Sequence, residues 1–318
     1  MQTLHTTIAD QGLRIDVFLK KHLPQYTRST LIKHIKNGFV LVNAKQSKPS
    51  YRLNGNENIS FNFPQEENTS LRANFSLSLP VIFQNDDFII INKPSGIQVH
   101  PSSTEKEKTV VNWLVAQYPD ISSVGDDPMR PGIVHRLDKD TSGIMIIAKN
   151  TSSFSELKKL FSQRNIQKSY VAITHSTPSP EKGSISLPIA RSRSFRKQTI
   201  VQEGTRYKGV SREALTEYKL LFSSYSKEFH LTYSVIQAFP KTGRMHQIRI
   251  HLSHIHCPII GDALYKKKEF PNPPEIKRFL LHAYSLEFSL FGKPYTFTLK
   301  PPQDYAHFLG DKNLFENS

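Results

Sequence analysis

The sequence predicts an α+β fold in which a sheet of mixed or antiparallel strands with flanking helices follows a small α/β domain. Over most of the 318 residues, short β-rich runs outnumber helical patterns, without the regular strand–helix alternation that builds a parallel sheet. A polar stretch at residues 64–73 has the composition of a linker and separates these runs from a compact segment with helix signals. We therefore place two domains, at residues 1–75 and 76–318.

The elements of the small domain are predicted from apolar spacing and end signals. Residues 13–19 carry an apolar face at helical spacing. A second helix begins after Thr27 or Ser29, either of which can cap it, and ends at Asn37-Gly38. Strand-like composition then marks residues 39–43 and 59–63.

The larger domain contains many short strand patterns and a few helical ones. Strands are expected where β-branched and aromatic runs are bounded by turn residues, at 81–83, 88–92, 144–149, 170–174, 214–222, 231–238 and 295–299. Helices are expected at 110–117, 154–163 and 246–255. A sheet flanked by few helices follows.

The charge balance favours a polyanionic partner. Lys and Arg total 42 against 27 Asp and Glu, a formal net charge of +15, while 37% hydrophobic residues indicate a globular chain. Such an excess attracts nucleic acid through counterion release. An anionic membrane surface is the alternative, but we find no long basic amphipathic helix, and the apolar runs are too short to cross a bilayer. We expect nucleic acid as the partner, and no membrane.

Cysteine and histidine usage argues against a metal site or a disulfide. Cys257 is the only cysteine, which excludes an intrachain disulfide and a multi-cysteine zinc site. Four histidines lie near it in the sequence, His246, His251, His254 and His256. No Asp or Glu accompanies them at the spacing of a zinc enzyme. Since the start of the chain also lacks a secretory signal, we expect a metal-free cytoplasmic protein.

The most informative segment lies at residues 131–149. A Pro-Gly turn opens it, and a loop bearing His135, Arg136, Asp138 and Asp140 leads into a buried strand. Ionisable side chains on a loop held by a rigid strand commonly build a functional site. From residue types alone, a surface loop whose Arg and Asp side chains merely pair explains the segment equally well.

This segment also carries a family resemblance. At 135–143, His-Arg-Leu-Asp followed by Thr-Ser-Gly resembles the signature of the RluA family of pseudouridine synthases. Further segments resemble that family and follow in the same order, at 92–100, 167–172, 214–219, 242–249, 258–265 and 281–283. Together with the signature, the resemblance extends over nearly all of residues 80–300. Met245 and the pair His256-Cys257 depart from the family pattern and question local packing more than activity.

The resemblance implies roles for individual side chains. Asp138 falls on the essential catalytic aspartate, Tyr170 on the active-site tyrosine, and Arg249 on the arginine that pairs with the aspartate. Tyr170 would stack on the extruded uracil and use its hydroxyl late in the reaction, as a base. Arg136 would fill the space that the uridine leaves or hold a phosphate, while His135 would order the loop. Residue types alone favour a helix-surface position for Arg249 and a half-buried strand position for Tyr170.

Isomerisation of uridine imports no electron or chemical group, so no cofactor is expected. The chain lacks both the dinucleotide glycine fingerprint and the phosphate-binding Gly-x4-Gly-Lys loop, which is consistent with that expectation.

Basic side chains recur in the small domain. Residues 28–43 resemble the small RNA-binding module that a small-subunit ribosomal protein shares with many pseudouridine synthases. We expect contacts to phosphate and RNA shape from a group of cations, Arg14, Arg28, Lys33, Lys36 and Lys45. A solvated basic face is the alternative.

A second basic run occupies residues 191–197, between apparent strands. We interpret it as a loop that closes over the RNA through Arg191, Arg193 and Arg196. A plain mobile loop explains the run nearly as well.

The predicted function is isomerisation of specific uridines in structured RNA by a monomeric enzyme. Large-subunit (23S) ribosomal RNA is the expected target, because relatives with this two-part layout mostly act on it; transfer RNA is the alternative target. Two other classes share some of these features. One is a non-catalytic ribosome-assembly protein that binds RNA, and the other is a glycosylase that releases free uracil.

Overall fold

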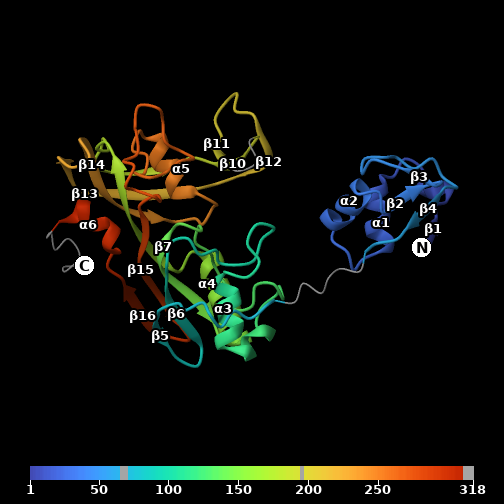
Figure 1. The fold of residues 1–318 in the computed structure, drawn as a ribbon, viewed down its shortest axis with the longest axis horizontal. Coiled ribbons are helices and arrows are strands. Elements are labelled where there is room, and N and C mark those ends of the chain that lie inside the picture. The colour runs from blue at the N-terminus through green and yellow to red at the C-terminus, as the bar shows by residue number, and fades with distance from the viewer. Residues whose placement is uncertain (65–70, 194–196, 311–318) are drawn as a thin grey trace. The chain divides into compact units, whose positions relative to one another are not determined.

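The computed structural model describes residues 1–64, 71–193 and 197–310 (Figure 1). The chain divides into two compact units, Met1–Ser70 and Leu71–Ser318. The end of the polar stretch belongs to the second unit. Asn112 Nδ2 donates to the Arg72 carbonyl at 2.7 Å, and the Asn74 amide donates to the Asn112 carbonyl at 2.9 Å. The division therefore falls a few residues before position 75.

Within residues 1–64, the first unit combines an antiparallel sheet with two helices. The strands lie in the order β1 (Gln2–His5), β4 (Asn58–Phe61), β2 (Val40–Val42) and β3 (Lys45–Gln46). A short 3-10 helix precedes the two α-helices, and these are η1 (Ile8–Asp10), α1 (Ile15–His22) and α2 (Arg28–Lys36). The apolar faces of both α-helices pack with the strands into one core. Thr27 accepts from the Thr30 amide at 3.2 Å, so Thr27 caps α2.

The second unit is built on one large sheet. Its strands follow the order β5 (Val81–Gln84), β6 (Phe88–Lys93), β7 (Ser142–Ala148), β15 (Leu281–Leu290), β8 (Gln167–His175), β14 (Leu231–Pro240), β13 (Leu215–Ser226) and β9 (Lys182–Ser186), with β16 (Lys293–Thr298) also paired to β15. The pair β15–β7 is parallel and the others are antiparallel. The predicted α+β class with a mixed sheet is confirmed.

Two hydrophobic cores share this sheet. One joins β6 and β7 to α3 (Val110–Gln117), the 3-10 helix η2 (Pro119–Ser123) and α4 (Thr151–Gln163). The other joins β8 and β14 to α5 (Gln247–His254), the 3-10 helix η3 (Gln303–Tyr305) and α6 (Ala306–Leu309). Figure 1 shows α3 and α4 near β6, α5 toward the opposite end of the unit, and α6 at its left side. Tyr170 packs against both cores and so marks their junction.

A separate sheet has the strand order β11 (Gln198–Ile200), β10 (Ile189–Ser192), β12 (Tyr207–Arg212). Arg191 pairs with Gln198 in antiparallel register, so the prediction of a loop throughout residues 191–197 is wrong at Arg191 and Ser192. Arg191 and Ser192 form a charged and polar pair without an apolar period, although backbone pairing places both in β10. The polar strands β1, β9 and β12 escaped prediction for the same reason.

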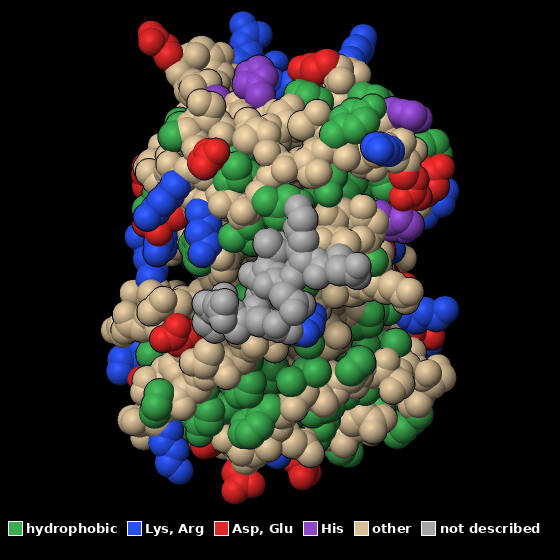
Figure 2. Space-filling view, turned by 90° about the vertical axis from the view of Figure 1, so that its left-hand side faces the viewer, with side chains coloured by type: hydrophobic (Ala, Val, Ile, Leu, Met, Phe, Trp, Pro, Cys, Tyr) green, Lys and Arg blue, Asp and Glu red, His purple; other side chains and the backbone are tan. Residues whose placement is uncertain are grey.

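The face shown in Figure 2 carries Lys and Arg interspersed with Asp and Glu around its margin, while hydrophobic side chains gather in the lower half. Among the described residues, no helix is long and apolar enough to span a membrane.

Candidate active site

Asp138 lies on a short loop immediately before β7. The Thr141 amide donates to the Asp138 carbonyl at 3.1 Å and tightens the loop. Gly143 follows with a φ of +114°, and a Cβ at this position would collide with the Ala283 backbone of β15. A glycine is therefore needed where β7 meets β15, and this close approach fixes where the loop leaves the sheet.

Lys93, at the end of β6, anchors the same loop. Its side chain is fully buried and donates to three carbonyls, those of Pro94 at 2.8 Å, Ile97 at 2.9 Å and Lys139 at 2.9 Å. Burial lowers the pKa of Lys93 to about 7, against the opposing effect of nearby carboxylates. Three acceptors require three N–H donors, which only the protonated amine supplies. The geometry therefore favours the charged form.

Lys93→Met is expected to lower the free energy of unfolding by about 2–5 kcal/mol, because it leaves three carbonyls without their donor in a buried place. Urea unfolding followed by circular dichroism measures the change. Lys108→Met, at an exposed lysine, is the control and should change stability by less than about 0.5 kcal/mol. Equal stabilities of the two variants would show that the three bonds contribute nothing.

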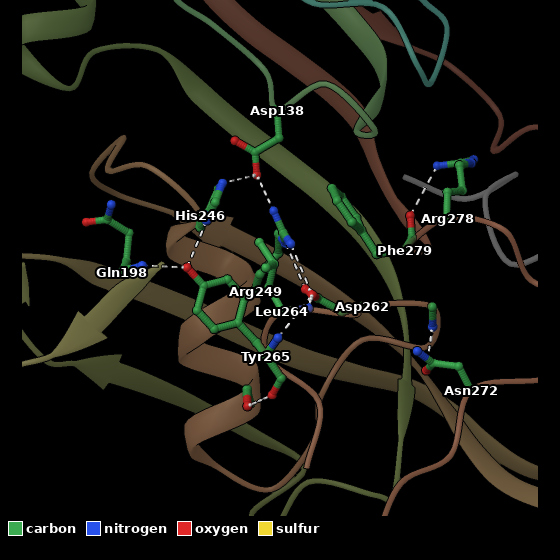
Figure 3. A network of polar contacts seen from close by, with 12 residues as sticks. Asp138, Gln198, His246, Arg249, Asp262, Leu264, Tyr265, Asn272, Arg278 and Phe279 are labelled. Atoms are coloured by element: carbon green, nitrogen blue, oxygen red, sulfur yellow. Dashed lines mark hydrogen bonds and ion pairs between the residues drawn. The ribbon is translucent and has the colours of Figure 1, made fainter. Parts of the chain in front are cut away.

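Arg249, on α5, joins Asp138 to a second carboxylate. Its Nη1 donates to Asp138 Oδ2 at 3.1 Å, while Nε and Nη2 donate to the two oxygens of Asp262 at 2.7 and 3.0 Å (Figure 3). Asp262 is fully buried, and its Oδ1 also accepts from the amides of Leu264 at 2.8 Å and Tyr265 at 3.1 Å. The bidentate bond to a carboxylate that is itself held by backbone fixes the plane of the guanidinium.

Aromatic rings cover the same guanidinium. Its carbon lies 4.0 Å from the Phe279 ring centre and 5.2 Å from that of Tyr265. Burial opposes the charged form, but the hydrogen bonds and charges of Asp262 and Asp138 outweigh it and raise the pKa of Arg249. Arg249 is 4% exposed and Asp138 is 18% exposed. Of this ion pair, Asp138 is therefore the member that a ligand can reach.

Asp138 faces a cavity of about 500 Å³, which is within the range of small-ligand sites. Its walls come from residues 98–102, the Asp138 loop, the start of α5 and residues 261–279. Exposed cations stand among the lining residues, namely Arg136, Lys139 and Lys277. The cavity thus combines a carboxylate with cations suited to an anionic ligand.

The predicted site residues separate into two groups here. Arg136, Asp138 and Arg249 line one cavity, as the prediction requires, whereas Tyr170 is not among its lining residues. Tyr170 lies half-buried on β8, opposite Ala238 of β14. Burial, reinforced by the charge of Asp138, raises the pKa of Tyr170 well above its ordinary value. Its hydroxyl is therefore held protonated and is better suited to donate a hydrogen bond than to act as a base.

His135 has the loop-ordering surroundings that the sequence suggests. Its Nε2 accepts from the Ile146 amide at 3.1 Å, and its ring stacks on Phe161 with centres 4.7 Å apart. Burial lowers the pKa of His135 to about 3, so the ring is neutral at physiological pH. In the described part of the chain, no three His, Cys, Asp or Glu side chains are grouped to hold a metal ion.

The basic residues expected to contact RNA occupy different settings. Lys33, Lys36 and Lys45 are exposed. Arg14 and Arg28 both bind the fully buried Asp16, at 2.9 and 2.8 Å, and so tie the start of α1 to the start of α2. They retain 40% and 52% side-chain exposure, which leaves both accessible to a phosphate. Arg191 and Arg193 are exposed on and beside β10, while Arg196 lies outside the described residues.

Four residues of the site have no role in the sequence-based interpretation: Lys93, His246, Asp262 and Tyr265. All four lie inside segments that carry the family resemblance, and the sequence offers His246 only as a candidate metal ligand. For Lys93 and Asp262, the sequence does hold a signal, since each charged residue stands beside an apolar run and is therefore expected to be buried with a partner. The contacts of His246 and Tyr265 depend on the fold and leave no local trace.

Comparison with known proteins identifies the family. A model described as RNA pseudouridylate synthase matches residues 87–254, and an S4 domain model matches residues 13–59. The chain is 34% identical over 310 residues to ribosomal large subunit pseudouridine synthase D of Neisseria meningitidis serogroup B, covering 94% of this chain and 78% of that protein. It is 33% identical over 312 residues to an uncharacterized RNA pseudouridine synthase of Aquifex aeolicus, covering 96% of this chain and 95% of that protein. The solved structure of human RNA pseudouridylate synthase domain containing 4 matches with a TM-score of 0.56 and 26% identity, over 72% of this chain and 91% of that chain. From its sequence and its fold alike, this chain belongs to the RNA pseudouridylate synthase family.

Proposed function

We propose that this RNA pseudouridine synthase isomerises specific uridines of large-subunit (23S) ribosomal RNA, with Asp138 as the catalytic carboxylate and without a cofactor. The observation that carries the proposal is the ion pair between Asp138 and Arg249 beside the cavity, in which the arginine is oriented by a second, buried carboxylate. A fixed guanidinium holds a carboxylate in one position, ready for a substrate.

The reaction needs an anionic group and little else. The bond between the sugar C1′ and the base N1 breaks, the uracil turns, and a bond forms between C1′ and C5. The hydrogen on C5 then leaves as a proton, and N1 gains one, so no oxidant or co-reactant is consumed. A carboxylate that reaches the sugar and base can stabilise or trap the cleaved state. Asp138, as the reachable member of the ion pair, suits this task.

The target is inferred from the relatives and from the charge. The Neisseria relative is named for the ribosomal large subunit, and it matches both units of this chain. The chain's formal charge of +15 and the S4 domain match at residues 13–59 support a large, structured RNA partner. We also propose a cytoplasmic location and a monomeric state, both of which are predictions from the sequence.

One assay tests the function. The full-length protein is incubated with 23S ribosomal RNA, or with transfer RNA, tritiated at uracil C5. Isomerisation releases the label while the base stays in the RNA, and we expect release from 23S RNA. Free uracil would identify a glycosylase, no release from either RNA would identify a binding protein, and release from transfer RNA alone would overturn the target.

Removal of residues 1–70 is expected to weaken binding to the target RNA at least about tenfold at physiological salt, because exposed cations that neutralise phosphates are lost. The dependence of affinity on salt should also flatten, by roughly one unit of slope for each phosphate contact removed. Filter binding at several salt concentrations measures both. The single-turnover rate at saturating enzyme should persist, since the second unit has its own cores and the whole cavity. Unchanged affinity and selectivity would exclude an RNA-binding role for the first unit.

A further inference from the structure

Tyr265 occupies a central position between three parts of the second unit. Its hydroxyl oxygen accepts from the Gln198 backbone amide of β11 at 2.8 Å and lies 2.8 Å from Nδ1 of His246 (Figure 3). Its ring lies against the guanidinium of Arg249. The hydroxyl therefore contacts the basic β10–β11 hairpin on one side and a histidine of the cavity on the other.

The contact between Tyr265 and His246 assigns the histidine tautomer. The phenol oxygen already accepts from Gln198, and within residues 71–193 and 197–310 the one acceptor that its proton meets is His246 Nδ1. A neutral imidazole that accepts at Nδ1 carries its proton on Nε2. That nitrogen faces Asp138 Oδ2 at 3.9 Å, and the carboxylate favours a proton on the side toward it. The Nε2–H group thus lies near the carboxylate on a second side, beside Arg249, at a distance that allows electrostatic attraction but exceeds that of a hydrogen bond.

The neutral state of His246 follows from its surroundings. Burial lowers the pKa of His246, and Arg249 and Arg136 act in the same direction, while the charges of Asp138 and Asp262 oppose them. The ring is therefore neutral near pH 7, which the tautomer assignment requires. Tyr265 keeps its proton as well, since burial raises its pKa to about 12.

The backbone supports a fixed position for His246. This residue precedes α5 with φ +57° and ψ +18°, a left-handed conformation that costs a residue other than glycine roughly 1–2 kcal/mol. Such strain persists where the surrounding structure holds the residue in place, and it gathers at functional sites. Because asparagine adopts this conformation readily, His246→Asn should not disturb the backbone.

The hairpin is joined to Tyr265 by packing as well as by the hydrogen bond. Tyr265 shares a small hydrophobic cluster with Ile189 of β10 and Ile250 of α5, and Ile200 of β11 packs against it. Exposed Arg191 and Arg193 belong to the same hairpin. A shift of the hairpin when these cations bind a phosphate would therefore be transmitted to Tyr265 through the packed side chains of this cluster.

We propose that His246 is a positioning residue for Asp138, and that Tyr265 couples the position of His246 to the basic β10–β11 hairpin. This inference rests on the proposed function. The Nε2–H group of His246, together with Arg249, restrains the position of Asp138. When the hairpin binds RNA phosphates, it holds Tyr265, and through it His246, in the position that aligns the carboxylate. RNA binding at the hairpin is thereby linked, through Tyr265 and His246, to the alignment of the Asp138 carboxylate.

Two variants of His246 separate positioning from packing. His246→Gln places an amide N–H near the former Nε2 and so keeps a polar hydrogen beside Asp138, whereas the shorter His246→Asn can accept from Tyr265 but leaves no polar hydrogen near Asp138. With the full-length chain and 23S RNA, we expect His246→Asn to lower the single-turnover rate about 10–100-fold, as loss of alignment does. His246→Gln should recover most of that loss. The RNA dissociation constant should stay within about threefold for both. Equal rates for wild type and His246→Asn would overturn the proposal, and so would equal losses for the two variants.

Two variants test the coupling through the tyrosine. Tyr265→Phe keeps the ring on Arg249 but removes the hydroxyl, so the Gln198 amide loses its acceptor. We expect hydrogen exchange at this amide to quicken at least about tenfold and the single-turnover rate to fall about tenfold. Tyr233→Phe is the control, because it removes another buried hydroxyl, one that donates to the Phe308 carbonyl at 2.8 Å. It should change neither quantity, and unchanged exchange or rate in Tyr265→Phe would exclude the coupling.

A spectroscopic readout is independent of activity. Nitrogen chemical shifts of the His246 ring, assigned by the loss of its signals in His246→Gln, should show Nε2 protonated and Nδ1 unprotonated at pH 7. A protonated Nδ1 would disprove the connection. The proposed function fails in a different way, namely if the wild-type protein forms no pseudouridine in 23S RNA or if Asp138→Asn retains activity.

Discussion

Asp138→Asn should lower the single-turnover rate of pseudouridine formation by at least about 10³-fold, equivalent to about 4 kcal/mol, while RNA affinity stays within about threefold of wild type. The amide has nearly the same shape as the carboxylate but carries no negative charge, and it is a weak nucleophile. The lost interaction is therefore one that acts in the transition state and not in RNA binding. Release of tritium from uracil C5, at enzyme concentrations that saturate the RNA, measures the rate.

Asp140→Asn is a suitable comparison for this variant. Asp140 lies two residues further along the same loop and also lines the cavity, and its carbonyl accepts from Arg278 at 3.1 Å. Because Arg249 binds the carboxylates of Asp138 and Asp262 and not that of Asp140, we expect a loss of less than about tenfold. Appreciable turnover by Asp138→Asn, or equal losses in the two variants, would remove Asp138 from its central role.

Arg249→Met should abolish turnover and also lower the free energy of unfolding by about 3–5 kcal/mol. The substitution leaves Asp262 fully buried without a countercharge, which is far more costly than losing an exposed ion pair. It also frees Asp138 from its orienting partner. Denaturant unfolding and the tritium assay measure the two effects.

A double variant separates the effect on stability from the effect on activity. In Arg249→Met with Asp262→Asn, the buried carboxylate that lost its partner becomes a neutral amide, which can still accept from the amides of Leu264 and Tyr265. Stability should recover by about 2 kcal/mol or more, because no unpaired charge stays buried. Activity should not recover, since Asp138 still lacks its partner. Recovery of turnover in the double variant would mean that Arg249 has only a structural role.

The regular elements of the fold could be predicted wherever their apolar residues recur with a clear period. The helix at residues 110–117 coincides with α3, and Phe88–Lys93 was located to within one residue. The polar strands of the β10–β12 sheet could not be found this way, because what makes them strands is pairing with each other, as in the register of Arg191 with Gln198. Pairing between distant segments leaves no period in either of them.

The candidate site shows the same division. Asp138 and Arg249 were selected from segments that resemble a family, and they lie 3.1 Å apart although 111 residues separate them. Nothing in the spacing of residues 131–149 or 242–249 predicts that contact. The family resemblance predicted that Arg249 pairs with Asp138. The structure gives the physical reason, because α5 lies beside the loop that precedes β7.

By itself, the sequence determined the class of fold, the two-part organisation, the basic character of the chain and which carboxylate to suspect, since composition, apolar period and local motif are properties of contiguous residues. Only the tertiary structure decided which side chains surround that carboxylate. Asp262 orients Arg249, Lys93 anchors the loop, and Tyr265 links β11 to His246, across sequence separations of 13 to 67 residues. These contacts form because a buried charged or polar group without a partner is costly, and which partner is within reach is settled by how the strands and helices pack.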